Sequence, residues 1–391
     1  MKVHFLILYF SLGLTLLSGM PNQILSINVD FFSEQIQLNY HPSILLAEMV
    51  RVEEKSMVNF FQQLEKSNYQ VLLDDLIAKK QQFQLNDWLS FSLLNKSLDD
   101  LFDRQHALQQ RLTAWFFLSK MGFDTRLTYL GQKVFIYVYT NDEVFEVPLI
   151  EDKGRKFVNL SGINQPTNPN EALYLLNFSP NAKGKSFSFY LDQLPTLSPI
   201  IHEQTYTFNY KDTTYQLIVK TDQTVKELMS AYPIFAETKY LEVPFSKAIA
   251  TSLLPQLEKI LERRSEKEKL ELLAAFTRSS FNYMEDKKVF GKSKPMIADE
   301  LFLYPYSDCE DRSALYYALV KNLLNLPMII IAFSDHLTLG VATNELSGPA
   351  IAYKGKHYFI CDPTGPANSS AVGQFPQGYE QKKFHIIGEY K

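Results

Sequence analysis

The chain has 391 residues, 46% of them hydrophobic, which is enough to bury a sizeable core in two or three domains. Its 39 basic and 43 acidic residues give a formal charge of −4, with no long run of either sign. Nucleic-acid binding and attraction to anionic membranes therefore have no electrostatic support.

The N-terminus resembles a secretory signal peptide. Lys2 gives a basic start, residues 5–17 are apolar, and Gly19 and Pro21 follow. The run is too short to span a bilayer, and no later stretch is apolar enough to do so. We therefore predict that residues 1–20 are a signal peptide and that the mature chain is exported, periplasmic or secreted, without a transmembrane span. A buried first helix or strand is the alternative, because the cleavage site lacks a clean A-x-A pattern.

Residues 24–165 are predicted to form an N-terminal α+β domain. Apolar residues recur at helical spacing over residues 45–76 and 86–121, which predicts four helices. Strand-like runs follow at 126–130 and 134–139, with a turn between them.

Residues 166–245 are predicted to form a β-rich module. The segment begins as a loop rich in Asn, Pro and Gly and then alternates between apolar and polar residues over 186–190, 206–210 and 214–219. Such alternation is typical of half-buried antiparallel strands, so we expect a sandwich-like arrangement.

The last predicted domain covers residues 246–391. A long helix is expected from Ser246 and a second helix over 270–281, with the charged segment 262–269 as a solvated face. The predicted fold class of the whole chain is α+β, and the residues suited to catalysis follow these helices.

Cys309 lies where the sequence predicts the start of a helix. Ser307 and Glu310 have the spacing of a capping box, which places Cys309 in the first helical turn. Unpaired amides and the positive end of the helix dipole favour a thiolate there, and a nearby imidazolium would favour it further. We therefore predict that Cys309 is a nucleophile.

His336 and Asp362 are the predicted partners of this cysteine. His336 follows the apolar strand 328–333 and a turn, and it opens the next strand. Asp362 ends another apolar strand, where Pro363 fixes the chain. A carboxylate so placed can accept the imidazole Nδ1 proton and orient the ring as a general base.

Cys309 and Cys361 are the two cysteines of the chain, so a disulfide between them is an alternative in an exported protein. Side chains alternate along a strand, however, so Cys361 should face the core if Asp362 faces a cleft. Cys309, His336 and Asp362 do not have the spacing of a zinc site. We predict no metal and no cofactor.

Three separated motifs resemble the transglutaminase-like superfamily, in particular exported bacterial members of the Bacteroidetes type. They are DCEDRS at 308–313, DH at 335–336 and CDPT at 361–364, and the similarity extends over about 250–380. The resemblance implies a papain-like core, in which a cysteine on a central helix faces a histidine and an aspartate on neighbouring strands. Ser307 departs from the family pattern, because many members carry glycine there.

An internal repeat is also suggested. Residues 111–120 align with 312–321, and residues 130–141 align with 333–344. In this register three pairs of residues are equivalent: Leu108 and Cys309, Lys133 and His336, and Ser161 and Asp362. The first copy would then be a degenerate, non-catalytic version of the second. Coincidence between two amphipathic helix-plus-hairpin units is the alternative.

These observations lead to two hypotheses. The first is an exported transglutaminase-like cysteine enzyme that cleaves peptide or carboxamide bonds through a thioester, with proteolysis or amide hydrolysis favoured over cross-linking. Its substrate would be a protein or peptide, and cell-envelope peptide is one candidate. The second is a catalytically silent binding or scaffold protein that retains a vestigial triad.

Overall fold

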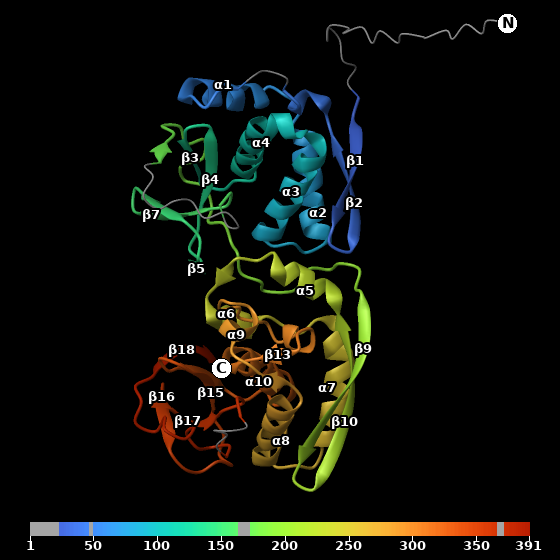
Figure 1. The fold of residues 1–391 in the computed structure, drawn as a ribbon, viewed down its shortest axis with the longest axis vertical. Coiled ribbons are helices and arrows are strands. Elements are labelled where there is room, and N and C mark those ends of the chain that lie inside the picture. The colour runs from blue at the N-terminus through green and yellow to red at the C-terminus, as the bar shows by residue number, and fades with distance from the viewer. Residues whose placement is uncertain (1–22, 47–49, 163–172, 366–370) are drawn as a thin grey trace, which may run out of the picture.

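The computed structural model describes residues 23–46, 50–162, 173–365 and 371–391. The protein is mixed α+β and consists of two stacked halves, the first running from β1 to β8 and the second from β9 to β18 (Figure 1). The predicted signal peptide, residues 1–20, lies outside the described residues. Every helix in the described ranges is too short or too polar to cross a membrane.

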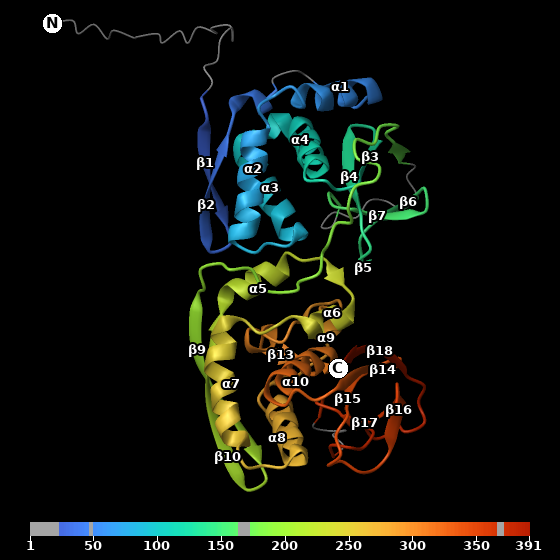
Figure 2. The same ribbon diagram turned by 180° about the vertical axis from the view of Figure 1, so that it is seen from behind.

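Each half places a β-hairpin at one edge, helices in the middle and a sheet at the other edge, as the two opposite views show (Figures 1 and 2). The first half contains β1 (Leu25–Phe31), β2 (Glu34–Tyr40), α1 (Glu54–Leu64), α2 (Gln70–Gln82), α3 (Asp87–Leu101), α4 (Ala107–Lys120), β3 (Thr125–Leu130), β4 (Lys133–Tyr139), β5 (Val144–Phe145), β6 (Leu149–Asp152), β7 (Arg155–Asn159) and β8 (Tyr174–Leu175). The four helices predicted for this part of the chain are confirmed.

The second half contains β9 (Ile201–Tyr210), β10 (Thr213–Asp222), α5 (Gln223–Ser230), β11 (Ile234–Phe235), α6 (Glu237–Glu242), α7 (Lys247–Leu261), α8 (Glu266–Ser279), β12 (Asn282–Tyr283), α9 (Asp286–Val289), β13 (Tyr306–Ser307), α10 (Cys309–Leu323), β14 (Met328–Ala332), β15 (Leu337–Val341), β16 (Ala350–Tyr353), β17 (Lys356–Cys361) and β18 (His385–Tyr390). A short 3₁₀ helix, Glu300–Phe302, precedes β13.

The two halves repeat one topology. The first sheet has the strand order β6-β7-β4-β3-β8 and the second has the order β16-β17-β15-β14-β18, and all neighbouring strands in both are antiparallel. The β6–β7 turn has positive φ at Lys153 and Gly154, and the β16–β17 turn has positive φ at Lys354 and Gly355. Two successive positive φ angles are typical of type I′ hairpin turns. The predicted correspondence of two helix-plus-hairpin units agrees with this topology.

The expected sandwich in residues 166–245 is not what the described residues form. Strands β9 and β10 make a two-stranded sheet that packs on α7 and α8, and the segment also contains α5 and α6. The alternation in the sequence is explained by this packing, because Tyr206, Phe208 and Leu217 are buried against the helices while intervening residues face solvent. The pattern predicted β9 and β10 correctly, but residues 186–190 do not form a strand, and the pattern did not reveal that helices cover the hairpin.

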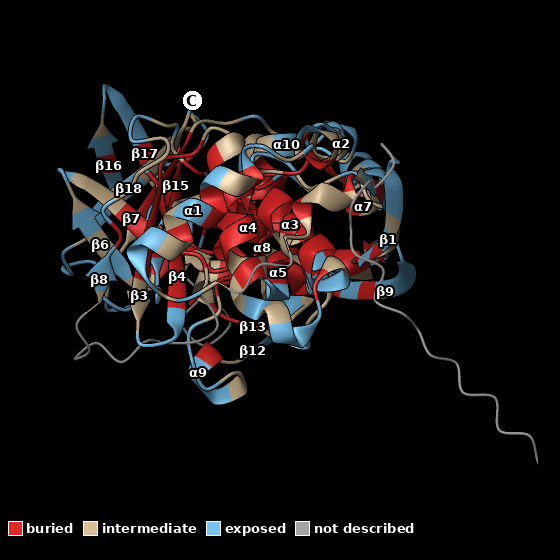
Figure 3. Ribbon diagram, turned by 90° about the horizontal axis from the view of Figure 1, so that it is seen from above, coloured by how far each residue is buried: buried red, intermediate tan, exposed pale blue. Residues whose placement is uncertain are grey.

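The hydrophobic core runs through the central helices of both halves. Seen from above, buried residues concentrate along α3, α4 and α8, while exposed residues lie on the hairpins and outer strands (Figure 3). The halves share part of this core, because Val225, Leu228 and Met229 of α5 pack into the cluster of the first half. Strand β5 also pairs with β11 across the two halves.

Asp299 connects the start of α7 to the segment before α10. Both of its carboxylate oxygens accept from the backbone amide of Ser246, at 3.1 and 3.2 Å. Ser246 is itself the N-cap of α7, since its side chain accepts from the amide of Ile249. Burial raises the pKa of Asp299 to about 7, although the Ser246 hydrogen bonds act in the opposite direction.

The raised pKa of Asp299 predicts a specific pH dependence of stability. Its folded pKa lies above the unfolded value of about 3.9, so its stabilisation is complete below that value and is lost as the pH rises towards 7. Asp299→Asn removes this titration. We expect the free energy of unfolding of the wild type, measured by urea denaturation, to fall between pH 5 and pH 8 by about 2–3 kcal/mol more than that of the variant. Equal changes in both proteins would contradict this expectation.

Candidate active site

Cys309 is the first residue of α10, as the prediction required, but the cap differs from the one expected. The N-cap is Asp308, and the backbone amide of Asp308 donates to Asp311 Oδ2 at 3.0 Å. We had assigned these roles to Ser307 and Glu310. Ser307 instead belongs to β13, and its hydroxyl accepts from Arg312 Nε at 3.2 Å. The helix therefore starts at Cys309, because Asp308 is extended as the N-cap and Ser307 before it lies in a strand.

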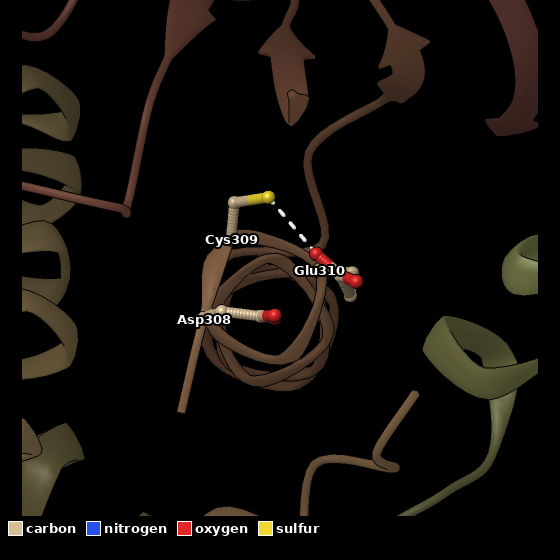
Figure 4. A group of neighbouring side chains, drawn as sticks. All are labelled: Asp308, Cys309 and Glu310. Carbon is tan, nitrogen blue, oxygen red and sulfur yellow. Dashed lines mark hydrogen bonds between the residues drawn. The ribbon is translucent and has the colours of Figure 1, made fainter. Parts of the chain in front are cut away.

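The Cys309 thiol donates to Glu310 Oε2 at 2.9 Å, and the backbone amide of Leu337 donates to the sulfur. Figure 4 shows the sulfur turned towards Glu310, with Asp308 across the end of the helix. Burial raises the pKa of the Cys309 thiol, and the charge and hydrogen bond of Glu310 raise it further. This is the reverse of the thiolate stabilisation expected at a helix start, because a carboxylate now contacts the sulfur.

His336 and Asp362 are brought together as predicted. His336 Nε2 lies 3.1 Å from Asp362 Oδ1, and the Thr338 hydroxyl donates to the same oxygen at 3.2 Å. The side chains are 9% and 3% exposed, so water competes little for this contact. The expectation that Asp362 would bind the Nδ1 proton is wrong, because the ring presents Nε2 to the carboxylate. Nδ1 is then the nitrogen left to act as a base.

The contact with His336 stabilises the ionised form of Asp362. Burial raises its pKa, but the hydrogen bond and charge of His336 outweigh that effect, so the pKa is lowered overall. The centroid of the His336 ring lies 5.1 Å from the centroid of the Tyr379 ring. The plane of the imidazole is roughly parallel to that of the Phe333 ring. The pair is thus held between aromatic side chains that limit rotation of the ring.

The structure does not bring the cysteine and the histidine into hydrogen-bonding contact. In the described part of the chain, no hydrogen bond joins Cys309 to His336, since the sulfur points to Glu310. The two residues are nevertheless neighbours in the fold, because Leu337, which contacts the sulfur, directly follows His336.

The disulfide alternative is wrong. Cys309 and Cys361 are both free, and Cys361 is fully buried in the core of the second half. Alternation along β17 directs Cys361 into that core, while Asp362 lies beyond the end of the strand next to His336.

Arg312 is a residue of this site that the sequence analysis did not single out. It lies on α10 and is fully buried. Its guanidinium donates to the carbonyl oxygens of Thr364, Gly365 and Phe281 and to the Ser307 hydroxyl. It thereby fixes the cysteine helix to the loop that follows Asp362 and to the end of α8. Its sequence signal is a charged residue directly before an apolar helical run.

A cavity of about 420 Å³ lies between the halves. It is lined by residues of both halves, including Phe145, Phe235 and Ile387. Glu237 of α6 also lines it, and α6 packs against α10. Desolvation raises the pKa of Glu237, and the charge of Glu310 adds to this effect. None of the residues that line the cavity is Cys309, His336 or Asp362.

Potential metal ligands gather at the start of α10 and include one member of the predicted triad, Cys309. Among the described residues, two groups of three side chains could hold a metal ion: Asp308, Cys309 and Glu310 form one, and Asp286, Asp308 and Asp311 form the other. Neither group includes His336 or Asp362.

Comparison of the chain with protein-family models, with curated proteins and with solved structures found no match in any of the three.

Proposed function

We propose that the protein is an exported transglutaminase-like cysteine enzyme that cleaves peptide or carboxamide bonds through a thioester. The observation that supports this most is the buried His336–Asp362 pair, at 3.1 Å, one residue from the backbone amide that contacts the Cys309 sulfur. A helix-start cysteine beside a carboxylate-oriented imidazole is the arrangement that nucleophilic acyl transfer needs. The papain-like description of the second half belongs to the same proposal.

The proposed reaction begins when the Cys309 side chain turns from Glu310 to His336. Asp362 accepts from Nε2–H, so Nδ1 takes the thiol proton while the sulfur attacks the carbonyl carbon. The backbone amide of Cys309 stabilises the oxyanion. Collapse of this intermediate breaks the C–N bond, and His336 returns the proton to the leaving amine. Water then attacks the thioester, gives a proton to His336 and releases the acid, and the proton returns to the sulfur.

The first half is proposed to be a degenerate copy of the catalytic unit. In the register of the repeat it carries Leu108, Lys133 and Ser161 at the positions of the three reacting residues. Lys133 is exposed, and the Ser161 hydroxyl accepts from the backbone amide of Ile136 at 2.7 Å. None of these side chains can form a thioester with a base beside it, so catalysis is assigned to the second half alone.

A binding or scaffold protein with a vestigial triad is the second candidate. It is favoured by the hydrogen bond between the Cys309 thiol and Glu310, because a thiol with a raised pKa is a poor nucleophile near neutral pH. The cavity between the halves would then serve binding without turnover.

Loss of activity in Cys309→Ala tests the enzymatic proposal. We expect the wild type to release amine from a mixed set of fluorogenic peptide amides, and the variant to be at least about a thousandfold slower. Cys361→Ala is the matched control, since it removes the other thiol and should retain activity. An acyl adduct on Cys309 by intact-protein mass spectrometry would support the thioester. Activity retained in Cys309→Ala, or no turnover by the wild type, would favour the scaffold hypothesis.

A further inference from the structure

Three buried carboxylates meet at the start of α10. Asp286, Asp308 and Asp311 each present one oxygen atom, and these atoms all lie within 4.8 Å of one another. The three residues are 5%, 6% and 0% exposed. Burying one carboxylate is costly unless it is paired, and three in contact repel each other strongly.

Asp286 belongs to a short helical segment at the surface, and its side chain extends inward to the cluster. It is the first residue of α9, a short helix at the outside of the molecule (Figure 3). The neighbouring Glu285, Lys287 and Lys288 are exposed, and Asp286 alone among them is buried. The α9 segment therefore packs against the rest of the protein through a buried carboxylate, whereas apolar side chains usually make such contacts.

The charges of the cluster are not balanced by a cationic side chain in contact with it. Within the described ranges, no ion pair involves these three carboxylates, and backbone amides donate to them, among them those of Lys294, Asp286, Met296 and Asp308. The Lys294 ammonium lies nearby in sequence but binds Glu300 at 2.7 Å. Arg312 uses its donors on carbonyls and a hydroxyl.

One oxygen of Asp308 accepts from no amide, hydroxyl or cationic group in the described part of the chain, although the Glu310 carboxyl lies beside the same side chain. Asp308 Oδ1 is buried without a hydrogen bond, whereas Oδ2 of the same residue accepts from the Asp286 amide at 3.4 Å. Buried polar atoms are almost always satisfied, and an exception calls for a ligand. The positive end of the α10 dipole, equivalent to about half a charge, offsets only a fraction of three carboxylates.

We propose that Asp286, Asp308 and Asp311 form a binding site for a hard divalent cation, with Ca²⁺ as the fitting ion. Carboxylate oxygens are the ligands that Ca²⁺ and Mg²⁺ prefer. Ca²⁺ accepts an irregular set of protein oxygens, whereas Mg²⁺ demands near-octahedral geometry and gives up its waters reluctantly, so a buried group of carboxylates suits Ca²⁺. The ion joins helix α9 to the N-terminus of α10. The site takes no ligand from Cys309 or His336, so cation binding can be measured separately from catalysis, although Asp308 directly precedes the cysteine.

The test is cation binding by the full chain after dialysis against EDTA. Isothermal titration with CaCl₂ should give one site, and the thermal midpoint should rise by about 2–5 °C at saturation. Asp308→Asn and Asp286→Asn should lose both responses while still folding in EDTA, because each removes a repulsive charge. Asp212→Asn, at an exposed turn carboxylate, is the matched control and should respond as the wild type does.

Three results would overturn the proposal: no Ca²⁺ binding by the wild type, unchanged binding in a folded Asp308→Asn or Asp286→Asn protein, or loss of binding in Asp212→Asn. Titration with MgCl₂ should give affinity at least about tenfold weaker than with CaCl₂, because Mg²⁺ gives up its bound waters reluctantly in a buried site. Equal affinity would overturn the assignment to Ca²⁺.

Discussion

Arg312→Met is expected to lower the free energy of unfolding by about 3–5 kcal/mol. The guanidinium is fully buried and is shared by three backbone carbonyls and a hydroxyl, so its removal leaves several polar atoms without partners. Burial lowers its pKa to about 10, yet the group remains charged at neutral pH. Urea denaturation followed by circular dichroism measures the change.

Two further variants make the Arg312 prediction specific. Arg312→Lys keeps a charge but cannot reach all four acceptors, so it should recover only part of the lost stability. Arg104→Met removes an exposed arginine and should change stability by less than about 0.5 kcal/mol. An Arg312→Met protein with the urea midpoint of the wild type would show that these hydrogen bonds do not hold the site together.

Glu310→Gln is expected to raise the rate of Cys309 alkylation by iodoacetamide at least about tenfold at pH 8. The Glu310 carboxylate accepts the thiol proton and repels a thiolate, and its replacement by a neutral amide of similar size removes both effects. The pKa of the thiol should fall, so the midpoint of the rate profile between pH 6 and 10 should move to lower pH. Each unit of that shift gives about a tenfold larger thiolate fraction.

Peptide mapping by mass spectrometry assigns the labelled cysteine in this experiment. Cys361 should stay unmodified in the folded protein because it is fully buried, and Cys309→Ser should abolish the labelling. Glu262→Gln changes an exposed carboxylate and is the matched control. Measurements in EDTA keep bound cations from altering the charge near the sulfur. An unchanged rate in Glu310→Gln would show that Glu310 does not control the thiol.

Many helices and hairpins of this protein could be predicted from its sequence, because the apolar pattern that specifies each of them is local and periodic. Apolar spacing marked α1 to α4, and alternation marked β9 and β10. The partner of a half-buried hairpin is a tertiary property, however, and the same alternation fits a second sheet or a layer of helices. The sandwich prediction failed for that reason.

The candidate site shows the same limit at the scale of single residues. Ser307 and Asp308 are both good N-cap residues, and each has an acidic residue three positions later, so the sequence could not decide where α10 begins. The choice between Nε2 and Nδ1 of His336 depends on ring orientation, which leaves no trace in the sequence. Asp286 lies far from Asp308 along the chain, and only folding brings them together.

The packing of α5 has a consequence for how such a molecule could have arisen and how it can change. By topology this helix belongs to the second unit, but three of its side chains complete the interior of the first. Deletion of either half would expose an apolar surface on the half that remains. The two halves are therefore not separate modules, and neither can be deleted or exchanged without rebuilding the contact between them.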